Sequence, residues 1–579
     1  MWKVANVCPV FKNGDKQNIT NYRPIALLSS VSKCLEKIVY KRLYEHCVDN
    51  SLLIENNSGF KHNDSTVNLL LSITYRIYKS IDDGTDICVV FLDVSKAFDK
   101  VWHEGLVFKL KELGVSGSVL NWFRDYLSHR SQKVVINGRC SSTKYTYAGV
   151  PQGSILGPLL FLIYMNNINF NIKSDIKLFA DDTALLRPLV KNQDIQIFNE
   201  DLEKLKNWSE QWKVNFNPSK TKYIIFSKKN VRHQYPPLFL NNVKLVEADF
   251  HKYLGLILSN NLSWGHHIVE IAKKANRRLD NMTRLRRYLP RYCLEILYKT
   301  MIRPVLDYGD VIYDGCTISE SEILERVQRR AAVLITGAFR LTKHETLLQE
   351  LGLTLLKTRR KHNRLKILYK IKTGKCPDYL RSTYPLINHN TQNYNFRRQN
   401  HIIPPQSRTV TFSSSFFPAT IRDWNRLSDD VKNSESISEF KKKLLDSEIL
   451  LKVPKYFSLG KGRGKIYHTR LRLGLSGLND HLFRYNLISY RNCNRCNKNI
   501  VETTEHFLLF CSKYNDIRKV LFNNLQKIIC PNVKFDVYTK YCPKYLVDLL
   551  LLGNEELSVE ENLEIFNNVF EYLVNTNRF

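Results

Sequence analysis

The sequence predicts an α/β protein of several domains, and three observations support this. Short runs of β-branched and aromatic residues alternate with longer segments of helical periodicity. The chain has 579 residues, more than a single hydrophobic core usually serves. Hydrophobic residues make up 43% of it and charged residues 25%, which is ordinary for a folded protein and argues against disorder.

We expect residues 1–85 to be helical after one short strand. Apolar residues recur there at helical spacing: Leu27, Val31, Leu35, Ile38 and Leu43. The segment STVNLLLSITYRIYKS (65–80) continues this pattern. The run DICVVFLDVS (86–95) is β-branched and aromatic throughout, so it predicts a strand covered on both faces. A helix over 118–128 and a strand at QKVVING (132–138) are expected next.

The middle of the chain predicts a helix, a hairpin, a second helix and a strand. PQGSILGPLLFLIYMNNI (151–168) is the first helix, with Pro and Gly at its entry. IKLFA (176–180) and TALLR (183–187) are short strands, and Asp181 and Asp182 fall where the chain must reverse. The second helix is amphipathic, and one face carries Ile195, Phe198, Leu202, Leu205 and Trp212. KYIIF (222–226) returns as a strand.

The chain is strongly basic. It has 87 Lys and Arg against 55 Asp and Glu, a formal charge of +32, so nucleic acid is the first partner to consider. Residues 270–375 are expected to be helical, and their basic faces are either solvated or in contact with backbone phosphates. Residues 376–415 predict a linker, 416–450 contain a short helical piece, and 465–579 form a separate C-terminal region.

Three carboxylates form the first candidate site. Asp93 ends the buried strand, and Asp181 and Asp182 lie at the hairpin tip. A strand end and an adjacent hairpin tip of one sheet can hold two divalent cations about 3.5 to 4 Å apart. Oxygen-only ligands select Mg²⁺ or Mn²⁺, and two such ions would activate a 3′-hydroxyl and hold a triphosphate. For any single Asp at a turn, turn chemistry is the competing interpretation.

The motifs around these residues favour the metal site. Five occur in order: FLDVSKAFDKVWH (91–103), AGVPQGSILGPLLF (148–161), FADD (179–182), NPSKTKYIIF (217–226) and KYLGLIL (252–258). Together with FKNGDKQNITNYRPIALLSS (11–30) and SGFKHNDST (58–66), the series resembles the reverse transcriptases of non-LTR (LINE) retrotransposons of the jockey-like kind. The resemblance covers nearly the whole chain. It implies an RNA-directed DNA polymerase of right-hand architecture with an α+β palm, RNA and DNA as partners, and dNTPs as substrates.

The resemblance also implies how the chain is divided. It places partial fingers at 1–85, the palm with the primer grip at 86–258 and a basic helical thumb at 259–375. A connector at 376–464 and a C-terminal region at 465–579 follow. The endonuclease typical of jockey-like elements and the upstream part of the fingers are both expected to be absent. The chain is therefore expected to be N-terminally truncated.

Roles carry over from the family residue by residue. Asp93, Asp181 and Asp182 match the metal-binding carboxylates, and Lys220 matches the lysine that protonates pyrophosphate, with Lys222 close enough to compete. The residues expected at the nucleotide are Lys12, Arg23, Phe98, Gln152 and Gly153. The residues that match the primer grip are Tyr253, Leu254 and Gly255.

A chemical reason supports the role expected of each nucleotide-binding residue. Lys12 and Arg23 would clamp the triphosphate through charge-assisted hydrogen bonds. Phe98 would collide with a 2′-hydroxyl and so select dNTPs, which argues against an RNA-dependent RNA polymerase. Gln152 would donate an amide hydrogen bond, and Gly153 would let the backbone approach. The competing interpretations are that Phe98 is an ordinary core residue and that Lys220 is a solvated lysine in a turn.

A second constellation lies near the C-terminus. Cys493, Cys496, His506 and Cys511 make C-x2-C-x9-H-x4-C, four ligands suited to a closed, tetrahedral, structural Zn²⁺ site. Free cysteines in a reduced protein are the alternative. The spacing also resembles the cysteine/histidine segment that follows the polymerase domain in this family. With HTRLRLGLSGLNDHLFRYNL (468–487), it implies contact with template RNA or target DNA.

Departures from the family leave a second function open. Asn57 stands where relatives usually have glutamine, which could weaken a template contact, and Asp99 is expected to have a structural duty. No ribonuclease H carboxylate set is evident. The alternative is a catalytically inactive relic that binds RNA or DNA without polymerising.

Cysteine usage and hydropathy bear on the compartment. The 13 cysteines are scattered, and MWKVANVCPVFK lacks the features of a signal peptide, so a reducing compartment is expected. The longest apolar run, ILGPLLFLIYM (155–165), is too short to span a bilayer. The resemblance implies a nuclear or cytoplasmic location.

Overall fold

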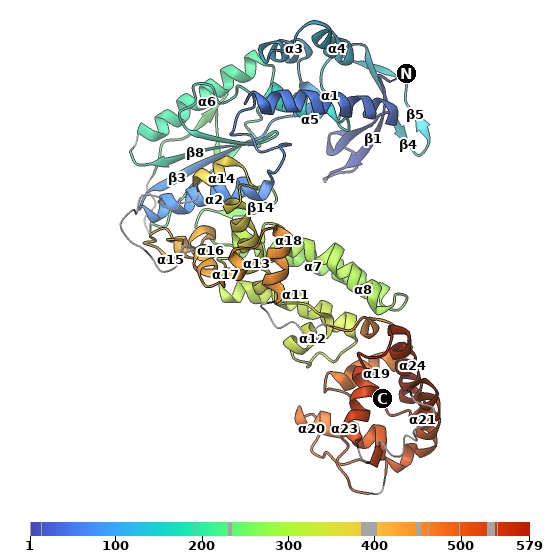
Figure 1. Ribbon diagram of the computed structural model, residues 1–579. Helices are drawn as coiled ribbons and strands as arrows, with labels where there is room; N and C mark the ends of the chain where they lie inside the picture. The colour runs from blue at the N-terminus through green and yellow to red at the C-terminus, as the bar shows by residue number, and fades with distance from the viewer. Residues whose placement is uncertain are drawn as a thin grey trace. The chain divides into compact units, whose positions relative to one another are not determined.

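The computed structural model describes residues 2–12, 14–191, 193–229, 234–383, 402–446, 453–460, 462–496, 498–529, 539–540 and 542–579 (Figure 1). Contacts divide the chain into two compact units. Unit 1 contains Met1–His266, Val311–Gly315 and Arg364–Leu427. Unit 2 contains His267–Asp310, Cys316–Asn363 and Ser428–Phe579. Unit 1 mixes helices with sheets, so the predicted α/β class is confirmed.

A first sheet of unit 1 lies near the start of the chain. Its strands are β1 (Val4–Phe11), β2 (Tyr22–Leu27), β4 (Arg130–Ile136), β5 (Arg139–Cys140) and β6 (Lys144–Thr146). β1 pairs antiparallel with β2 and parallel with β4. The prediction of one strand before the helices missed β2, because its run YRPIAL is short and carries a proline.

Helix α1 (Ser30–Asp49) has the predicted spacing but turns a different face inward. Val31 and Ile38 are 60% and 63% exposed, whereas Glu36 is buried. The Glu36 carboxylate accepts hydrogen bonds from Tyr126 Oη at 3.0 Å and from the Ile155 backbone N–H at 2.6 Å. A satisfied buried carboxylate therefore sets the helix rotation, which apolar periodicity does not reveal.

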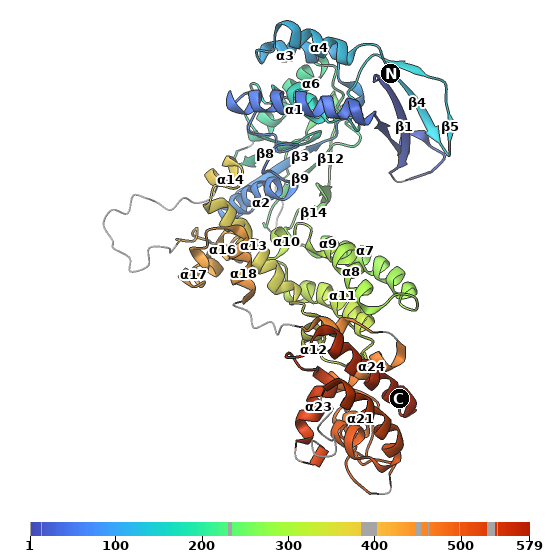
Figure 2. The same ribbon diagram turned by 45° about the vertical axis from the view of Figure 1, so that its right-hand side comes forward.

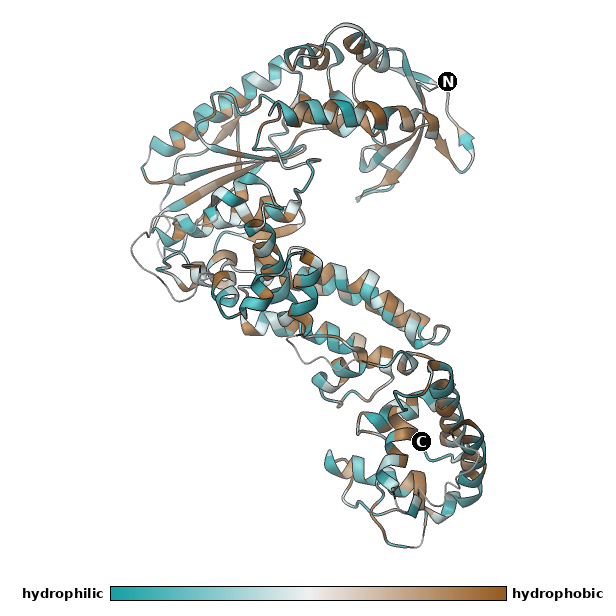
Figure 3. Ribbon diagram, in the orientation of Figure 1, coloured by the Kyte–Doolittle hydropathy of each residue, from teal (hydrophilic) through white to brown (hydrophobic). Residues whose placement is uncertain are grey.

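The second sheet of unit 1 positions the carboxylates. Its order is β12 (Val246–Glu247), β9 (Lys222–Phe226), β3 (Asp86–Leu92), β8 (Asp182–Leu189) and β7 (Asp175–Phe179). Every residue of the central strand β3 is buried, as predicted. Figure 3 shows these central strands in the hydrophobic colour. The predicted strands at 176–180, 183–187 and 222–226 are confirmed by β7, β8 and β9.

Helices pack on this sheet and on one another. α2 (Thr66–Asp82) and α6 (Gln193–Gln211) pack on its strands, whereas α3 (His103–Glu112) packs on α4 (Gly117–Leu127) and α5 (Leu156–Tyr164). Figures 1 and 2 show α2 and α6 on opposite sides of β3 and β8. The sequence patterns did not predict α3. α5 is shorter than the predicted 151–168 helix. It begins only at Leu156, where Ser154 Oγ accepts a hydrogen bond from the Gly157 N–H at 2.8 Å.

Short hairpins complete the sheet region. β13 (Phe250–Tyr253) pairs antiparallel with β14 (Leu256–Ser259), and β10 (Phe239–Leu240) pairs with β11 (Val243–Lys244). A 3-10 turn, η2 (Ala97–Lys100), follows β3.

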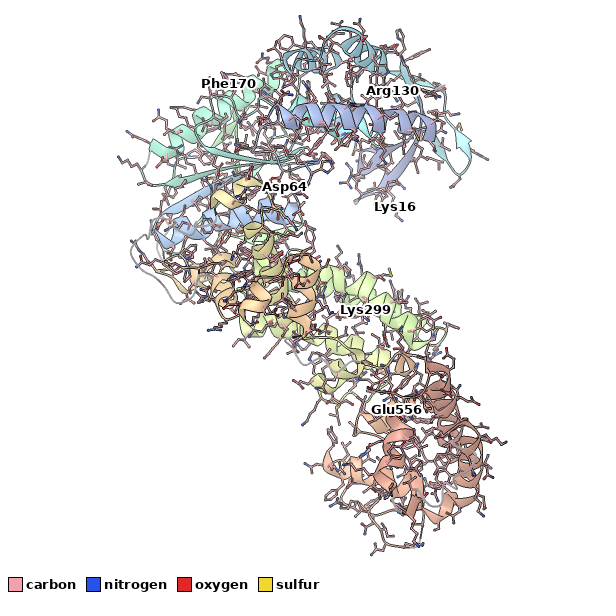
Figure 4. The ribbon with its side chains drawn as sticks, in the orientation of Figure 1. Lys16, Asp64, Arg130, Phe170, Lys299 and Glu556 are labelled. Atoms are coloured by element: carbon pink, nitrogen blue, oxygen red, sulfur yellow. The ribbon has the colours of Figure 1, made fainter. Side chains whose placement is uncertain are left out.

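The described ends of the predicted linker are docked rather than loose. They contain α14 (Asp378–Thr383) and α15 (Val410–Ser413), and α16 (Phe416–Asn425) follows. Tyr379 Oη donates to Asp64 at 2.8 Å, and Figure 4 labels Asp64. The buried carboxylate of Asp82 accepts from the backbone N–H groups of Arg408 and Thr409. Residues 384–401 of the predicted linker lie outside the described residues.

Unit 2 is helical, which confirms the prediction for 270–375. Its helices there are α7 (Gly265–Leu285), α8 (Arg291–Leu297), a π-helical turn (Tyr298–Ile302), α9 (Arg303–Asp307), α11 (Ile318–Thr336) and α12 (His344–Leu351). α10 (Asp310–Tyr313) and α13 (Leu356–Lys372) have residues in both units, as does α7, whose first two residues belong to unit 1. No helix among the described residues is long and apolar enough to cross a bilayer.

The later part of unit 2 contains mostly short helices. They are α17 (Asp429–Lys432), α18 (Ile437–Asp446), α19 (Gly462–Arg472), α20 (Asn479–Arg484), α21 (Asn515–Ile529), α23 (Pro543–Leu552) and α24 (Val559–Asn575). The predicted helical piece within 416–450 is therefore present, and 447–450 lie outside the described residues.

Candidate active site and metal-ligating cluster

Strand register brings the three carboxylates together. β3 pairs antiparallel with β8 up to Leu92 opposite Thr183. One step further along this register, Asp93 faces Asp182. Phe179 pairs with Asp182 across the β7–β8 hairpin, so Ala180 and Asp181 form its two-residue turn. Asp93 and Asp182, 89 positions apart in sequence, thus meet at one edge of a sheet, as predicted.

The turn itself is held from outside the hairpin. Ala180 has φ +58°, a left-handed conformation that costs a non-glycine residue about 1 kcal/mol or more. Its N–H is directed at Asn57 Oδ1 at 3.3 Å, and the same oxygen accepts from Gly59 N–H at 3.0 Å. Asn57 is 2% exposed, and its segment bridges to Leu178 of β7. A Cβ at Gly59 would lie 2.4 Å from Ala180 N, so only glycine fits there.

Electrostatics at the turn favour a cation. Burial, followed by the charge of Asp93, raises the pKa of Asp181 above its usual range. Asp182 reaches the surface, yet desolvation at the turn and repulsion from Asp181 and Asp93 raise its pKa to about 6. The positive charge of Arg23 opposes both pKa shifts, and that of Lys12 opposes the shift of Asp181. The donors of this cluster are oxygen only, the ligand type that Mg²⁺ and Mn²⁺ prefer.

Lys12 and Arg23 reach the site from the β1–β2 hairpin. Val10 pairs with Arg23, and the Lys12 N–H donates to Asn21 O at 2.8 Å. Both side chains are exposed, which leaves them available to an anionic ligand beside the carboxylates.

The loop of Lys220 is fastened to the backbone of Asp93. Asn217 N–H donates to Asp93 O at 2.8 Å, and the Asp93 N–H donates to Thr221 Oγ1 at 3.3 Å. Lys220 and Lys222 are both exposed. Burial, and to a smaller extent the charge of Lys222, lowers the pKa of His251 to about 4. The backbone of Asp93 is thus joined to Asn217 and Thr221, which lie on either side of Lys220 in the chain, whereas the charge of Lys222 acts on His251 of β13.

Phe98, Gln152 and Gly153 meet neighbours that the sequence did not predict. Phe98 stacks on Phe161 with ring centroids 4.6 Å apart, and it is partly exposed. Gln152 Nε2 donates to Asp99 at 2.8 Å, which gives Asp99 the structural duty expected of it. Gly153 has φ +131°, and a Cβ there would lie 2.4 Å from the oxygen of Ala26 on β2. Its glycine requirement comes from packing on β2.

The 253–255 turn contacts the carboxylate hairpin through Tyr253. Tyr253 is 4% exposed and its Oη donates to the backbone oxygen of Asp182 at 3.3 Å. Burial, with the charges of Asp182 and Asp181, raises its pKa well above 10, so the hydroxyl keeps its proton. Leu254 and Gly255 have φ +44° and +88° and make the tight turn between β13 and β14.

The Cys/His cluster in unit 2 is compact and buried. One ligand atom from each of Cys493, Cys496, His506 and Cys511 lies within 4.8 Å of all the others. The Sγ atoms of Cys493 and Cys511 are 3.9 Å apart, and Cys496 Sγ is 3.5 Å from His506 Nε2. A tetrahedral Zn²⁺ with bonds of about 2.3 Å to sulfur and 2.0 to 2.1 Å to nitrogen requires separations of about 3.8 and 3.6 Å. The residues present therefore fit zinc.

Backbone groups and a buried arginine hold this cluster. Arg495 N–H donates to Cys493 Sγ at 3.4 Å, and Cys511 N–H donates to His506 O at 2.7 Å. Arg518 donates to the backbone oxygens of Leu508 and Cys511 at 2.7 and 2.8 Å. The ligand loop is thus fixed by hydrogen bonds that do not involve the metal.

The roles of Asn57 and Tyr253 in holding the carboxylate turn are not encoded in a local sequence pattern. Asn57 Oδ1 accepts the N–H groups of Gly59 and Ala180, a contact that the expectation of a weakened template contact does not include. Tyr253 is buried and donates to Asp182 O, and its assignment to the primer grip stays a prediction. A buried residue beside a positive-φ turn is a signal that only coordinates supply.

Residues 12–258 match the family model described as "Reverse transcriptase (RNA-dependent DNA polymerase)". The probable RNA-directed DNA polymerase from transposon BS of Drosophila melanogaster is 30% identical over 365 residues, which is 61% of this chain and 40% of that protein. The RNA-directed DNA polymerase from mobile element jockey of the same organism is 29% identical, over 58% of this chain and 38% of that protein. The chain thus spans about 40% of the length of these curated relatives.

Similar solved structures are more distant. The telomerase of Candida tropicalis in complex with a telomeric RNA fragment is 9% identical, with a TM-score of 0.38, covering 78% of this chain and 65% of that one. The RNA-dependent RNA polymerase of a human picorbirnavirus is 12% identical, with a TM-score of 0.24, covering 38% of this chain and 42% of that one.

Proposed function

We propose that residues 12–258, which match the reverse transcriptase family model, form a polymerase domain of the non-LTR retrotransposon type with the right-hand fold, and that this chain extends a DNA primer on an RNA template. The observation that carries the proposal is the register of β3 on β8, which places Asp93 beside Asp181 and Asp182. Three like charges held at one sheet edge store repulsion that a divalent cation relieves.

The residues of this chain would divide the work at the reacting centre. Asp93, Asp181 and Asp182 would hold two Mg²⁺ or Mn²⁺ ions, which supply activation of the primer 3′-hydroxyl and stabilisation of the leaving pyrophosphate. Lys12 and Arg23 would bind the triphosphate, as their exposed side chains and their pull on the carboxylates support. Lys220 would give a proton to pyrophosphate, since its loop is fastened to Asp93.

Substrate selection would depend on Phe98. Its ring is fixed by stacking on Phe161, and rigidity is what a steric filter against a 2′-hydroxyl requires. Replacing Phe98 with Val should raise incorporation of rNTPs relative to dNTPs by at least about tenfold, measured by single-nucleotide extension. Free use of rNTPs by the wild type would contradict this role.

The remaining site residues would act through the backbone. Gln152 and Gly153 would shape the nucleotide pocket by tying it to Asp99 and to Ala26 on β2. Tyr253, Leu254 and Gly255 would set the primer end through the tight turn beneath Asp182.

Zinc would be structural in unit 2. Cys493, Cys496, His506 and Cys511 fill all four tetrahedral positions and leave none for water or substrate. Template RNA and target DNA are the proposed partners of this region. Because thiolate ligands need a reducing environment, we place the chain in the nucleus or cytoplasm.

Primer extension tests the proposal. The full chain, with Mg²⁺, dNTPs and a DNA primer on an RNA template, should extend the primer, and Asp181→Asn should abolish extension. Asp83→Asn, an exposed carboxylate after α2, is the matched control and should extend normally. No extension by the wild type would contradict the proposal, and retained RNA binding in that case would favour the inactive binding protein instead.

A further inference from the structure

A large cavity in unit 2 has an unusual lining. It has a volume of about 880 Å³ and lies where the end of α7, the start of α8, the end of α11 and the start of α19 converge. Gly337, which follows α11, links these walls: a Cβ there would lie 3.0 Å from both Arg286 and Ile466. Arg470 Nε also donates to Gly337 O at 2.9 Å. The walls of the cavity are thus in contact with one another.

The lining is cationic, and part of that charge is unpaired. Its basic residues are Arg286, Arg287, Arg291, Arg463 and Lys465, and no carboxylate lines it within the described ranges. Arg291 is paired with Glu295 and Glu350, and Lys465 donates to Ser458 O at 2.6 Å. Along the stretches with described structure, Arg286, Arg287 and Arg463 have no ion pair or side-chain hydrogen bond. These three guanidinium groups are exposed, so water screens their mutual repulsion, and their hydrogen-bond donors are free to contact an anion that enters the cavity.

The basic charge continues along α7. Lys273, Arg277 and Arg284 lie along one exposed stripe of that helix, over about 16 Å at 1.5 Å per residue. Asp280 shares this stripe and is already paired with Arg330 at 2.6 Å. A polyanion bound in the cavity could therefore extend along the helix, which a small anion could not.

Shape favours a single strand over a duplex. A cavity of about 880 Å³ is in the range that encloses a ligand of roughly nucleotide size, whereas a duplex is too broad to enter it. Tyr288 at its rim is 82% exposed and offers a ring on which a base can stack. Cations that follow a backbone beside an exposed aromatic ring are the combination that single-strand sites use.

We propose that this cavity binds single-stranded nucleic acid, with Arg286, Arg287 and Arg463 contacting phosphates and Tyr288 stacking on a base. The site deepens the proposed function, since it supplies a binding place for the strand outside the paired template and primer. It is built wholly from unit 2 and does not involve the carboxylates of unit 1.

The test measures binding alone. Full chains are titrated into labelled single-stranded RNA, single-stranded DNA and a hairpin duplex, in EDTA-free buffer lacking Mg²⁺ and dNTPs. The variant Arg286→Gln/Arg287→Gln/Arg463→Gln should bind either single strand at least about tenfold more weakly. The slope of log K against log salt should fall by about 2, since each lost phosphate contact removes about 0.7. Duplex binding should change less.

Controls separate the site from generic charge. Lys441→Gln/Lys442→Gln/Lys544→Gln removes the same charge from exposed positions of unit 2 and should leave the affinity near wild type. Tyr288→Ala should weaken binding about tenfold, and Tyr288→Phe should restore it, because the phenyl ring still stacks. Equal losses in the two triple variants, or an equal loss on the duplex, would overturn the proposal. Asp181→Asn should bind normally, so failure of polymerisation and failure of this site are distinguishable.

Discussion

The carboxylate turn of unit 1 and the Cys/His cluster of unit 2 gather their proposed metal ligands in opposite ways. The cluster draws its ligands from residues 493–511, and their spacing already matches a tetrahedral ion. The carboxylates come from chain segments distant in sequence, and the pKa values of Asp181 and Asp182 are raised because burial and repulsion between carboxylates oppose their charge. A closed structural site can thus be local, whereas a site that must stay open to substrate is imposed by the surrounding fold.

The difference also concerns what holds each site. Arg518 and the backbone hold the Cys/His loop, and its ligands are buried. The carboxylate turn depends on Asn57, Gly59 and Tyr253, which stabilise a left-handed Ala180 and the carbonyl of Asp182. Mutations should therefore separate activity from stability in unit 1 and couple zinc to stability in unit 2.

The largest effect is expected from Asp182→Asn. Primer extension should fall at least about a thousandfold, because a metal ligand worth several kcal/mol is lost. Stability should not fall with it. Removing one of three repelling charges should leave the unfolding midpoint equal or slightly higher, by about 1 kcal/mol at most after solvent screening. Extension assays and thermal unfolding measure the two quantities, and a large loss of stability would break the comparison.

Cys496→Ser should show the opposite pattern. Zinc content should fall, and the melting of unit 2 should shift down by several degrees, because metal binding contributes to folding. Extension of a short preformed primer should fall far less than in Asp182→Asn. Cys542→Ser, an exposed cysteine outside the cluster, is the control. Unchanged zinc content in Cys496→Ser would contradict the ligand assignment.

Features encoded by neighbouring residues were predictable from the sequence, whereas features set by distant contacts were not. β3, the β7–β8 hairpin and the four Cys/His ligands were predictable, because each is encoded by neighbouring residues. The rotation of α1 was not, since a single satisfied carboxylate, Glu36, decides it. Neither was the docking of Arg408 and Thr409 on Asp82, because contacts between residues more than 300 positions apart leave no local pattern.

Asn57→Ala should produce an intermediate effect. Losing the buried acceptor leaves the N–H groups of Gly59 and Ala180 unpaired and lets the carboxylate turn relax. We expect kcat to fall about ten- to a hundredfold with little change in KM for dNTPs, since misplacement near the chemistry affects the reacting step. Asn121→Ala, on an exposed face of α4, should be neutral. A raised KM with normal kcat would instead support a template or nucleotide contact.

The smallest effect is expected from Tyr253→Phe, which removes one hydroxyl beneath Asp182. The ring keeps its packing against Phe91, with centroids 4.9 Å apart, so only the hydrogen bond to Asp182 O is lost. A neutral hydrogen bond is worth about 1 kcal/mol, and kcat should therefore fall about fivefold. Tyr253→Ala removes the ring as well and should lower both stability and kcat much further. If Tyr253→Phe instead raised the Kd for primer and left kcat unchanged, Tyr253 would be a direct primer contact. The carboxylate hairpin would then be held in place by the rest of the β13–β14 turn.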